Sequence, residues 1–315
     1  MSTSHDHRVS EPSRLEEVAE GVFAYIQPDG SWMINNTGFL SARDGVTAID
    51  ACSTERRTRD FLETVKDVTR RPVRTLVNTH HHPDHTAGNG LFKQATIVAH
   101  DNARPEMRLL GLPRNSGIWT DVDYGNLELT LPFLTFADRL TLWVDDLRCE
   151  LLFAGQPAHT NNDIVAWIPE RSVLFAGDLV FNGGTPFLLS GSVTGAADVL
   201  ENFVRPLGAR TIVPGHGPVA GPEIIDEVLG YLRFVRETAV RGLGAGLTPL
   251  EAARDCDLGR YAEWSDTERI VGNLHRAYAD LAAAEADALR AVVDMPGALA
   301  DMVTYNGGRP LTCLA

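Results

Sequence analysis

The spacing of apolar residues along the chain separates two kinds of element. Short runs in which apolar side chains are contiguous, or alternate with polar ones, predict strands, because successive strand side chains point to opposite faces. The expected strands are residues 21–27, 38–40, 46–51, 73–78, 95–100, 139–144, 149–154, 164–168, 173–176 and 211–213. Apolar residues three or four positions apart predict helices. These are expected at residues 54–70, 102–110 and 196–204, with a short helix after Gly88.

Turn-forming residues and the C-terminal third complete this outline. Two dipeptides predict hairpin turns, Asp29-Gly30 and Asp44-Gly45. Residues 111–128 are irregular and rich in proline and glycine, so we expect a loop over the functional site. Residues 222–293 have an interrupted helical pattern, and residues 295–315 are expected to be extended.

The order of these elements predicts the domain organisation. Strands and helices alternate in two stretches, which favours an α/β domain with two sheets between helix layers. We expect this catalytic domain at residues 14–220 and a helical C-terminal extension, residues 221–315, that completes the domain and its pocket. The polar start, residues 1–13, is expected to be disordered.

Composition and charge narrow the classes of function. Hydrophobic residues make up 44% of the 315 residues, which suffices for a buried core. The net charge of −14 repels phosphate backbones, so nucleic acid is not expected as a partner. No secretory signal and no run of about 18 apolar residues is present, and the four cysteines lack paired spacing. We therefore expect a cytoplasmic protein without a membrane partner.

The segment with the sequence H-x-H-x-D-H carries the strongest chemical signal. His80 and His82 alternate at the end of a predicted strand, so their imidazoles point to the same side. The chain turns at Pro83, which aims Asp84 and His85 at a second point beside the first. Four such side chains are costly to bury unpaired, and metal ions remove that cost. The segment therefore predicts a metal centre.

Three further candidate ligands follow predicted strands. His159 lies in G-Q-P-A-H-T, Asp178 ends L-F-A-G-D, and His216 lies in V-P-G-H-G-P. Loops at strand ends are the usual place for a site built on a rigid sheet. His81, between two candidate ligands, points the other way along the strand and is expected to have a structural role.

Together and in this order, the four motifs resemble the metallo-β-lactamase superfamily over about residues 15–220. The resemblance implies an αββα sandwich that holds two metal ions. It assigns His80, His82 and His159 to the first ion, Asp84, His85 and His216 to the second, and Asp178 to both. Imidazole and carboxylate ligands suit two zinc ions, with iron or manganese as alternatives. With Asp178 where some β-lactamases use cysteine, the pattern is nearer to hydroxyacylglutathione hydrolases and lactonases.

A two-metal centre of this kind predicts an enzyme, a metal-dependent hydrolase. Ions about 3.5–4 Å apart activate a water molecule, which attacks a carbonyl carbon whose oxygen is polarised. Asp84 and Asp178 are the expected catalytic carboxylates, and Asp84 is expected to accept or relay a proton. An inactive, metal-free relative is the alternative, but no ligand of the set is missing.

Neighbouring residues are candidates for supporting roles. Asp50 and Asp163 would either hold ligand loops through hydrogen bonds or serve as ordinary turn and cap residues. An aromatic-walled pocket is expected from residues in loops beside the motifs. Its candidates are Trp32, Asn35, Asn36, Trp119, Phe181 and Phe187.

Segments outside the metal motifs bear on the substrate. Residues 15–60, the run R-T-L-V-N-T-H-H-H-P-D-H-T and the tail G-G-R-P-L-T-C-L-A are similar to the actinorhodin-type cyclase/thioesterases of actinomycete polyketide pathways. The resemblance implies antibiotic biosynthesis, with a bicyclic polyketide thioester on an acyl carrier protein as the substrate. The enzyme would close a ring by aldol chemistry and hydrolyse the thioester.

Other functions stay open at this point. A generic thioester or lactone hydrolase, similar to hydroxyacylglutathione hydrolases, is the main alternative. A mononuclear iron sulfur dioxygenase and a non-catalytic binder of acyl carrier protein are the others. The partners then range from a carrier-bound polyketide to a small thioester, and a homodimer is compatible with all of these readings.

Overall fold

Two β-sheets form the centre of the computed structural model, which describes residues 12–283, 289 and 291–315. All of the predicted disordered start except Pro12 and Ser13 lies outside the described residues. The first sheet contains, in spatial order, β1 (Arg14–Ala19), β2 (Val22–Ile26), β3 (Thr37–Ser41), β4 (Val46–Ile49), β5 (Val73–Val77), β6 (Thr96–His100) and β7 (Leu134–Phe136). The second contains β12 (Thr211–His216), β11 (Val173–Phe181), β10 (Ile164–Ile168), β9 (Leu147–Phe153) and β8 (Arg139–Val144).

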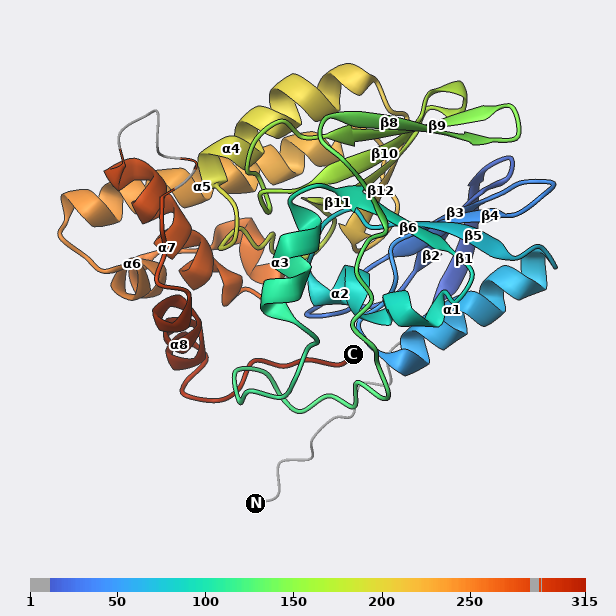
Figure 1. Cartoon of the computed structure of the whole chain (residues 1–315). Helices are drawn as coiled ribbons and strands as arrows, with labels where there is room; N and C mark the ends of the chain where they lie inside the picture. The colour runs from blue at the N-terminus through green and yellow to red at the C-terminus, as the bar shows by residue number, and fades with distance from the viewer. Residues whose placement is uncertain (1–11, 284–288, 290) are drawn as a thin grey trace.

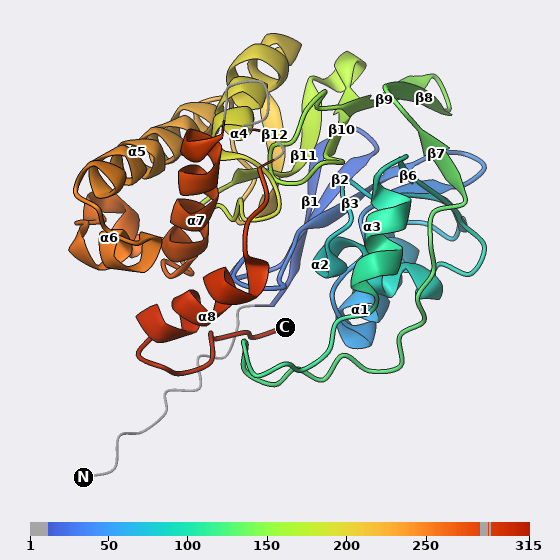
Figure 2. The ribbon, with the colours of Figure 1, turned by 60° about the vertical axis from the view of Figure 1, so that its left-hand side comes forward.

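Helices cover the outer face of each sheet (Figure 1). On the side of the first sheet lie α1 (Glu55–Val68), α2 (Pro83–Thr86) with a following 3₁₀ turn (Ala87–Leu91), and α3 (Ala103–Leu110). On the side of the second sheet lie α4 (Val193–Val199), α5 (Ile224–Gly244), α6 (Pro249–Asp255), α7 (Arg269–Ala282) and α8 (Met295–Tyr305). Figure 2 shows these two groups of helices on opposite sides of the sheets. The predicted arrangement of two sheets between helix layers is confirmed.

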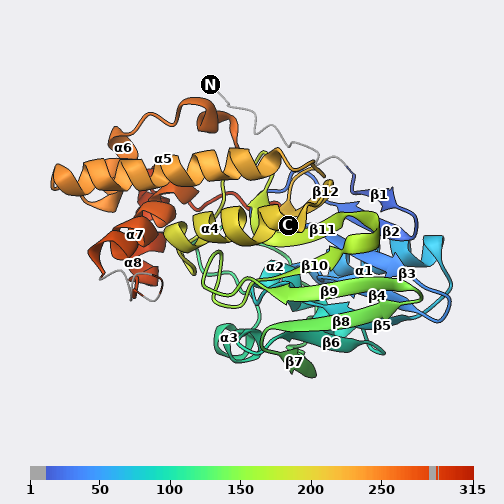
Figure 3. The ribbon, with the colours of Figure 1, turned by 90° about the horizontal axis from the view of Figure 1, so that it is seen from above.

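Three apolar clusters hold the layers together. One lies between the sheets and includes Leu40, Leu151 and Phe175; a second joins α1 to the first sheet. The largest joins the second sheet to the C-terminal helices, and Figure 3 shows α4 and α5 running across that side. Strands β10 and β11 are buried at every position, because both of their faces are covered. This explains why they are nearly continuous apolar runs in the sequence.

Helix α1 forms as its sequence predicts. Thr54 caps its N-terminus, because the Thr54 hydroxyl accepts a hydrogen bond from the Arg57 amide. Phe61 and Val65, four residues apart, are 0% and 1% exposed and pack beneath the first sheet. The packing of this amphipathic face sets the position of the loop before α1, whose Ala51 amide donates to the carbonyl of His85 in the metal-binding motif at 2.9 Å.

Two local predictions are wrong. Asp29-Gly30 does not form a tight hairpin turn, because residues 27–36 make a long connection between β2 and β3. The side-chain amide of Asn36 anchors this connection by donating to the carbonyls of Pro214 and Gly217, at 2.9 and 2.7 Å. Such a contact between distant segments overrides the local turn preference.

Residues 295–315 are not extended throughout, since α8 occupies the first half. The Asp294 carboxylate accepts from the Gly297 amide and caps the helix, and Pro296 follows in its first turn. Ala298 and Met302 are fully buried on one face.

The pattern of apolar residues does not predict β1 and β7, which the structure shows as separate strands. The predicted boundary near residue 220 falls between β12 and α5 and stays a prediction.

The C-terminal tail ties the irregular loop of residues 111–130 to the body of the protein (Figure 1). The Leu311 amide donates to the Ile118 carbonyl at 2.8 Å, and the Thr120 amide donates to the Leu311 carbonyl at 2.9 Å. The Leu311 side chain is 0% exposed. Among the described residues, no helix combines the length and apolar character needed to cross a membrane.

Leu311→Ala tests whether the tail stabilises the fold. Removing this buried side chain leaves a cavity and is expected to lower the free energy of unfolding by about 2 to 4 kcal/mol. Leu314, three residues away and 42% exposed, provides a matched control. Its replacement by alanine should change stability by at most about 0.5 kcal/mol. Equal urea midpoints for the two variants would contradict the anchoring role of Leu311.

Candidate metal centre

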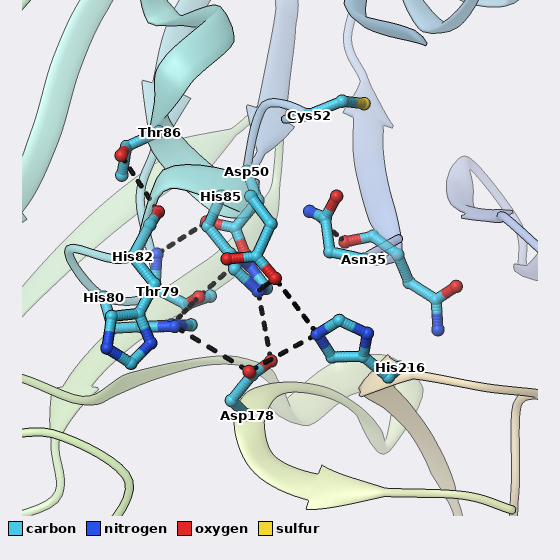
Figure 4. Close-up of polar contacts among 12 residues, drawn as sticks. Asn35, Asp50, Cys52, Thr79, His80, His82, His85, Thr86, Asp178 and His216 are labelled. Carbon is cyan, nitrogen blue, oxygen red and sulfur yellow. Dashed lines mark hydrogen bonds and ion pairs between the residues drawn. The ribbon is translucent and has the colours of Figure 1, made fainter. Parts of the chain in front are cut away.

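All seven predicted ligands converge, six of them at or beyond the ends of strands and Asp178 within a strand. His80, His82, Asp84 and His85 follow β5 and continue into α2. His159 lies in the loop between β9 and β10, Asp178 lies within β11, and His216 is the last residue of β12. Figure 4 shows the Asp178 carboxylate facing His80, His85 and His216.

The side chains form two groups that share Asp178. One group is His80, His82, His159 and Asp178, and the other is Asp84, His85, Asp178 and His216. In each group the potential ligand atoms lie within 4.8 Å of one another. Nε2 of His159 is 3.3 Å from Oδ2 of Asp178, and Nε2 of His85 is 3.1 Å from its Oδ1. Oδ2 of Asp178 also lies 3.4 Å from Nε2 of His216 in the second group. The carboxylate therefore lies between the two groups, where a bridging ligand would stand.

Buried atoms without hydrogen-bond partners indicate that cations belong here. Among the described residues, Nε2 of His80, Nε2 of His85 and Oδ1 of Asp178 are buried and make no hydrogen bond. Each such orphaned polar atom costs free energy unless a ligand compensates it. Five imidazoles and two carboxylates are a nitrogen and oxygen donor set that zinc and similar divalent ions accept. The residues present thus fit a dinuclear metal site.

Burial and mutual charge set the protonation states of the centre. Burial, together with the neighbouring His85, lowers the pKa of His80 well below its ordinary value, which favours the neutral ligand form. For Asp178, burial raises the pKa, but His216, His85 and His159 together outweigh it and hold the pKa well below the usual range. Asp178 is therefore a carboxylate that needs positive charge around it.

Hydrogen bonds on the outer side of the rings orient the ligand histidines. The Asp50 carboxylate accepts from Nδ1 of His85 at 2.8 Å. Backbone carbonyls accept from two others: Phe187 from His159 at 2.6 Å, and Gly30 from His216 at 3.0 Å. Because Nδ1 donates in each case, the lone pair of Nε2 faces the centre. His80 follows the same rule, since its Nδ1 lies 3.1 Å from the Thr79 hydroxyl, which itself donates to Asp50.

Of the two supporting aspartates, Asp50 is therefore the one that holds a ligand directly. It also accepts from the Thr79 amide at 2.7 Å, so it fixes the backbone just before the metal-binding motif. Asp163 instead accepts from the amide and hydroxyl of Thr160, at 2.8 and 2.6 Å. It stabilises the turn that follows His159 rather than the His159 ring.

A cavity of about 750 Å³ opens onto the centre. Four of the six pocket candidates line it: Trp32, Trp119, Phe181 and Phe187. Asn35 and Asn36 do not line it, since their buried amides bond to the backbone. His81 lines the cavity but belongs to neither ligand group, and it lies in the bend after β5 rather than within a strand.

Sequence reasoning missed a second set of lining residues. They come from α3, α7 and α8: Glu106, Leu109, Leu110, Arg269, Arg276, Met295 and Leu299. Arg269 is the most constrained of these. Its guanidinium lies 4.0 Å from the centroid of the Trp32 ring and pairs with Asp266 at 2.8 Å. The capping residue Asp294 could have indicated α8 in the sequence. No local sequence feature, however, connects α3, α7 and α8 to the metal-binding motif.

Comparisons with known proteins agree with this geometry. The family model described as "Metallo-beta-lactamase superfamily" matches residues 30–216. A metallo-β-lactamase type 2 of Bacteroides fragilis is 23% identical over 227 residues, 70% of this chain and 85% of that protein. A hydroxyacylglutathione hydrolase of Rhodospirillum rubrum is 30% identical over 138 residues, 44% of this chain and 45% of that protein.

A third relative and a solved structure complete the comparison. The linear primary-alkylsulfatase of a Pseudomonas species is 24% identical over 256 residues, 67% of this chain, but this chain spans only 48% of that protein. The solved structure of a metallo-β-lactamase from Pontibacter korlensis aligns with a TM-score of 0.58 and 19% identity. It covers 70% of this chain and 99% of that chain. The predicted αββα sandwich is confirmed.

Asp178→Ala tests the bridging position. Because Asp178 belongs to both ligand groups, its loss is expected to reduce the metal content of the purified protein at both positions, measured by elemental analysis. His81→Ala is the matched control, since His81 lies beside the centre but outside both groups, and it should retain the wild-type metal content. Full metal content in Asp178→Ala would refute the bridging position of Asp178. Metal loss in His81→Ala would refute the placement of His81 outside both ligand groups.

Asp50→Asn tests the support of His85. The substitution keeps the size of the side chain but removes the charge that orients the His85 ring. Metal affinity, titrated against a competing chelator, is expected to fall by about tenfold to a hundredfold. Asp101→Asn, an exposed site with the same charge change, is the control and should leave the affinity unaltered. Equal losses in both variants would show that Asp50 acts through net charge alone.

Proposed function

This chain belongs to the metallo-β-lactamase superfamily, and from that premise we propose that it is a dizinc hydrolase of acyl compounds. The residues that would hold the ions are the seven of the two groups that share Asp178. The observation that carries the proposal is the cavity of about 750 Å³ that opens directly onto them. Its volume lies in the range of about 300–1,000 Å³ that is typical of small-molecule sites.

The chemistry of hydrolysis divides between the ions and the protein. When bound, two zinc ions generate a nucleophile from water near neutral pH and polarise a carbonyl oxygen. Asp84 lines the cavity, and its Oδ2 lies 3.3 Å from Nε2 of His216. A carboxylate in that position accepts a proton from the attacking water and passes it to the leaving group. Apolar side chains such as Trp119 and Phe187 line the cavity around it.

For the substrate, we propose an aromatic polyketide thioester carried by an acyl carrier protein. Support comes from the resemblance of residues 15–60 and of the C-terminal tail to polyketide cyclase/thioesterases. The cavity wall adds to it, because Trp32 meets Trp119 and Phe187 edge to face, with ring centroids 5.4 and 5.0 Å apart. Planar aromatic surfaces pack well against such walls.

Two reactions would take place at the same centre. In ring closure, an enolate carbon of the chain adds to a ketone carbon, and a proton moves to the new alkoxide. In release, water adds across the thioester and yields a free acid and the carrier thiol. Both reactions develop negative charge on a former carbonyl oxygen, so one electrostatic environment serves both.

Hydrolysis of a small thioester is the second candidate. The 30% identity to a hydroxyacylglutathione hydrolase favours it, although that alignment covers 44% of this chain. Such a substrate would need the same ligands and the same nucleophile. The two candidates therefore differ in the acyl group and in the thiol carrier, and not in the metal chemistry.

Substrate assays on the zinc-loaded protein separate these proposals. We expect turnover of aromatic polyketide mimics bound to carrier protein to exceed that of glutathione thioesters, homoserine lactones and a β-lactam. A preference for the glutathione thioester would favour the second candidate. A single iron in the protein as purified, with oxygen consumption, would overturn the hydrolase proposal, and so would a zinc-loaded protein that turns over none of these compounds. Asp178→Ala is the matched negative control.

A further inference from the structure

A chain of four polar side chains runs from helix α3 to the wall of the cavity. We call it the amide chain: Glu106, Asn161, Asn162 and His81. Oε1 of Glu106 accepts from Nδ2 of Asn161 at 3.1 Å, and Oδ1 of Asn161 accepts from Nδ2 of Asn162 at 2.7 Å. Nδ2 of Asn162 lies 2.9 Å from Nδ1 of His81. None of the four belongs to the metal-ligand groups.

The carboxylate at one end fixes the direction of every bond. An ionised carboxylate accepts hydrogen bonds and donates none. Asn161 must therefore turn its NH₂ group toward Glu106 and its oxygen toward Asn162. Asn162 then presents its NH₂ group both to Asn161 and to His81. The Nδ1 atom of His81 has to accept, so the proton of this imidazole is on Nε2.

This tautomer is the reverse of the one that three of the ligand histidines adopt. His85, His159 and His216 donate from Nδ1 to an oxygen acceptor and turn the Nε2 lone pair toward the metal centre. His81 instead accepts at Nδ1 from an amide. Its Nε2 carries a hydrogen and has no lone pair to give a metal ion. His82 differs from these three, because its Nδ1 lies 2.8 Å from Nε2 of His159 and therefore faces the centre.

The Nε2–H group of His81 is available to a molecule in the cavity. His81 is 9% exposed and is one of the residues that line the cavity. Within the described part of the chain, its Nε2 makes no hydrogen bond, and it is not one of the fully buried polar atoms that lack a partner. The ring centroid lies 4.6 Å from that of His82, a candidate ligand. The donor is therefore one imidazole away from the metal centre.

We propose that His81 is a substrate-binding residue whose Nε2–H donates a hydrogen bond to a second oxygen of the acyl substrate, with Glu106, Asn161 and Asn162 as positioning residues. The inference rests on the proposed function, because it places an acyl compound in this cavity. It narrows the substrate class to acyl compounds that carry a keto or phenolic oxygen besides the reacting carbonyl. Compounds without that oxygen leave the Nε2–H of His81 without a hydrogen-bond acceptor.

A pair of thioesters that differ in one oxygen tests the contact. Acetoacetyl and butyryl thioesters of N-acetylcysteamine are assayed with the zinc-loaded protein, and the ratio of their kcat/KM values is compared between variants. Intrinsic reactivity cancels in this comparison. His81→Phe is expected to lower the wild-type preference for the 3-oxo compound by about threefold to tenfold, the worth of one hydrogen bond between neutral partners. An unchanged ratio in His81→Phe would overturn the proposal.

His275→Gln is the matched control. His275 is a second histidine outside the metal centre; it pairs with Asp301 at 2.8 Å and does not line the cavity. Its replacement should leave the substrate ratio at the wild-type value. A wild-type protein that hydrolyses neither thioester, nor any of the carrier-bound, glutathione or lactone substrates, contradicts the proposed function instead. The tautomer of His81 is then still decided by a second measurement.

That measurement is ¹⁵N NMR of the zinc-loaded full chain with labelled histidine rings, which distinguishes the Nε2–H from the Nδ1–H tautomer. The signals of His81 are those missing from His81→Phe. We expect the Nε2–H form in the wild type. In Glu106→Gln the new amide can donate a hydrogen bond to Asn161. The direction of the hydrogen bonds along the amide chain is then no longer fixed, and the Nδ1–H form of His81 should become populated. An Nδ1–H ring in the wild type overturns the proposal, and an unchanged Glu106→Gln spectrum overturns the positioning role of the amide chain.

Discussion

The buried carboxylate of Asp178 is the group around which the rest of the site has to be arranged. It is 6% exposed and lies within 3.1 to 3.9 Å of four histidine Nε2 atoms. Strand β12 packs so closely on it that a Cβ atom at Gly215 would collide with Oδ1 of Asp178. Gly177, at a φ of 51°, bends β11 just before the aspartate. The glycines of A-G-D and P-G-H are therefore steric requirements of the carboxylate's position.

Orientation of the histidines is the second requirement. Except for His82, whose Nδ1 lies 2.8 Å from Nε2 of His159, it depends on the outer partner that each Nδ1 atom meets. Where the partner is an oxygen acceptor, as Asp50 is for His85, the Nε2 lone pair is directed to the metal centre. Where the partner is the amide of Asn162, as for His81, a hydrogen faces the cavity instead. Neighbouring residues of one motif thus acquire opposite chemical roles from their outer hydrogen bonds. The acceptors come from loops far apart in the chain, including the Gly30 and Phe187 carbonyls.

The cavity depends on contacts across the whole length of the chain. Trp32 is part of its wall, where its Nε1–H donates to Glu268 at 2.7 Å and its ring stacks under the guanidinium of Arg269. The C-terminal tail reaches the same wall, because the Cys313 thiol donates to the Trp32 carbonyl at 3.3 Å. The helical extension therefore does more than cover the second sheet, since it supplies one side of the space that opens onto the metal centre.

The sequence by itself predicted most of the strands and helices and the set of seven candidate ligands. Strand and helix patterns are local, and the candidate ligands stand in motifs with short, specific spacing, so both could be predicted. Tertiary structure alone decided the connection of residues 27–36, the walls contributed by α3, α7 and α8, and the tautomer of His81. Each of these depends on partners far apart in the chain: Asn36 with Gly217, Arg269 with Trp32, and Asn162 with His81. Packing and hydrogen-bond direction are properties of neighbours in space, and a local pattern of residue types does not specify which neighbours those are.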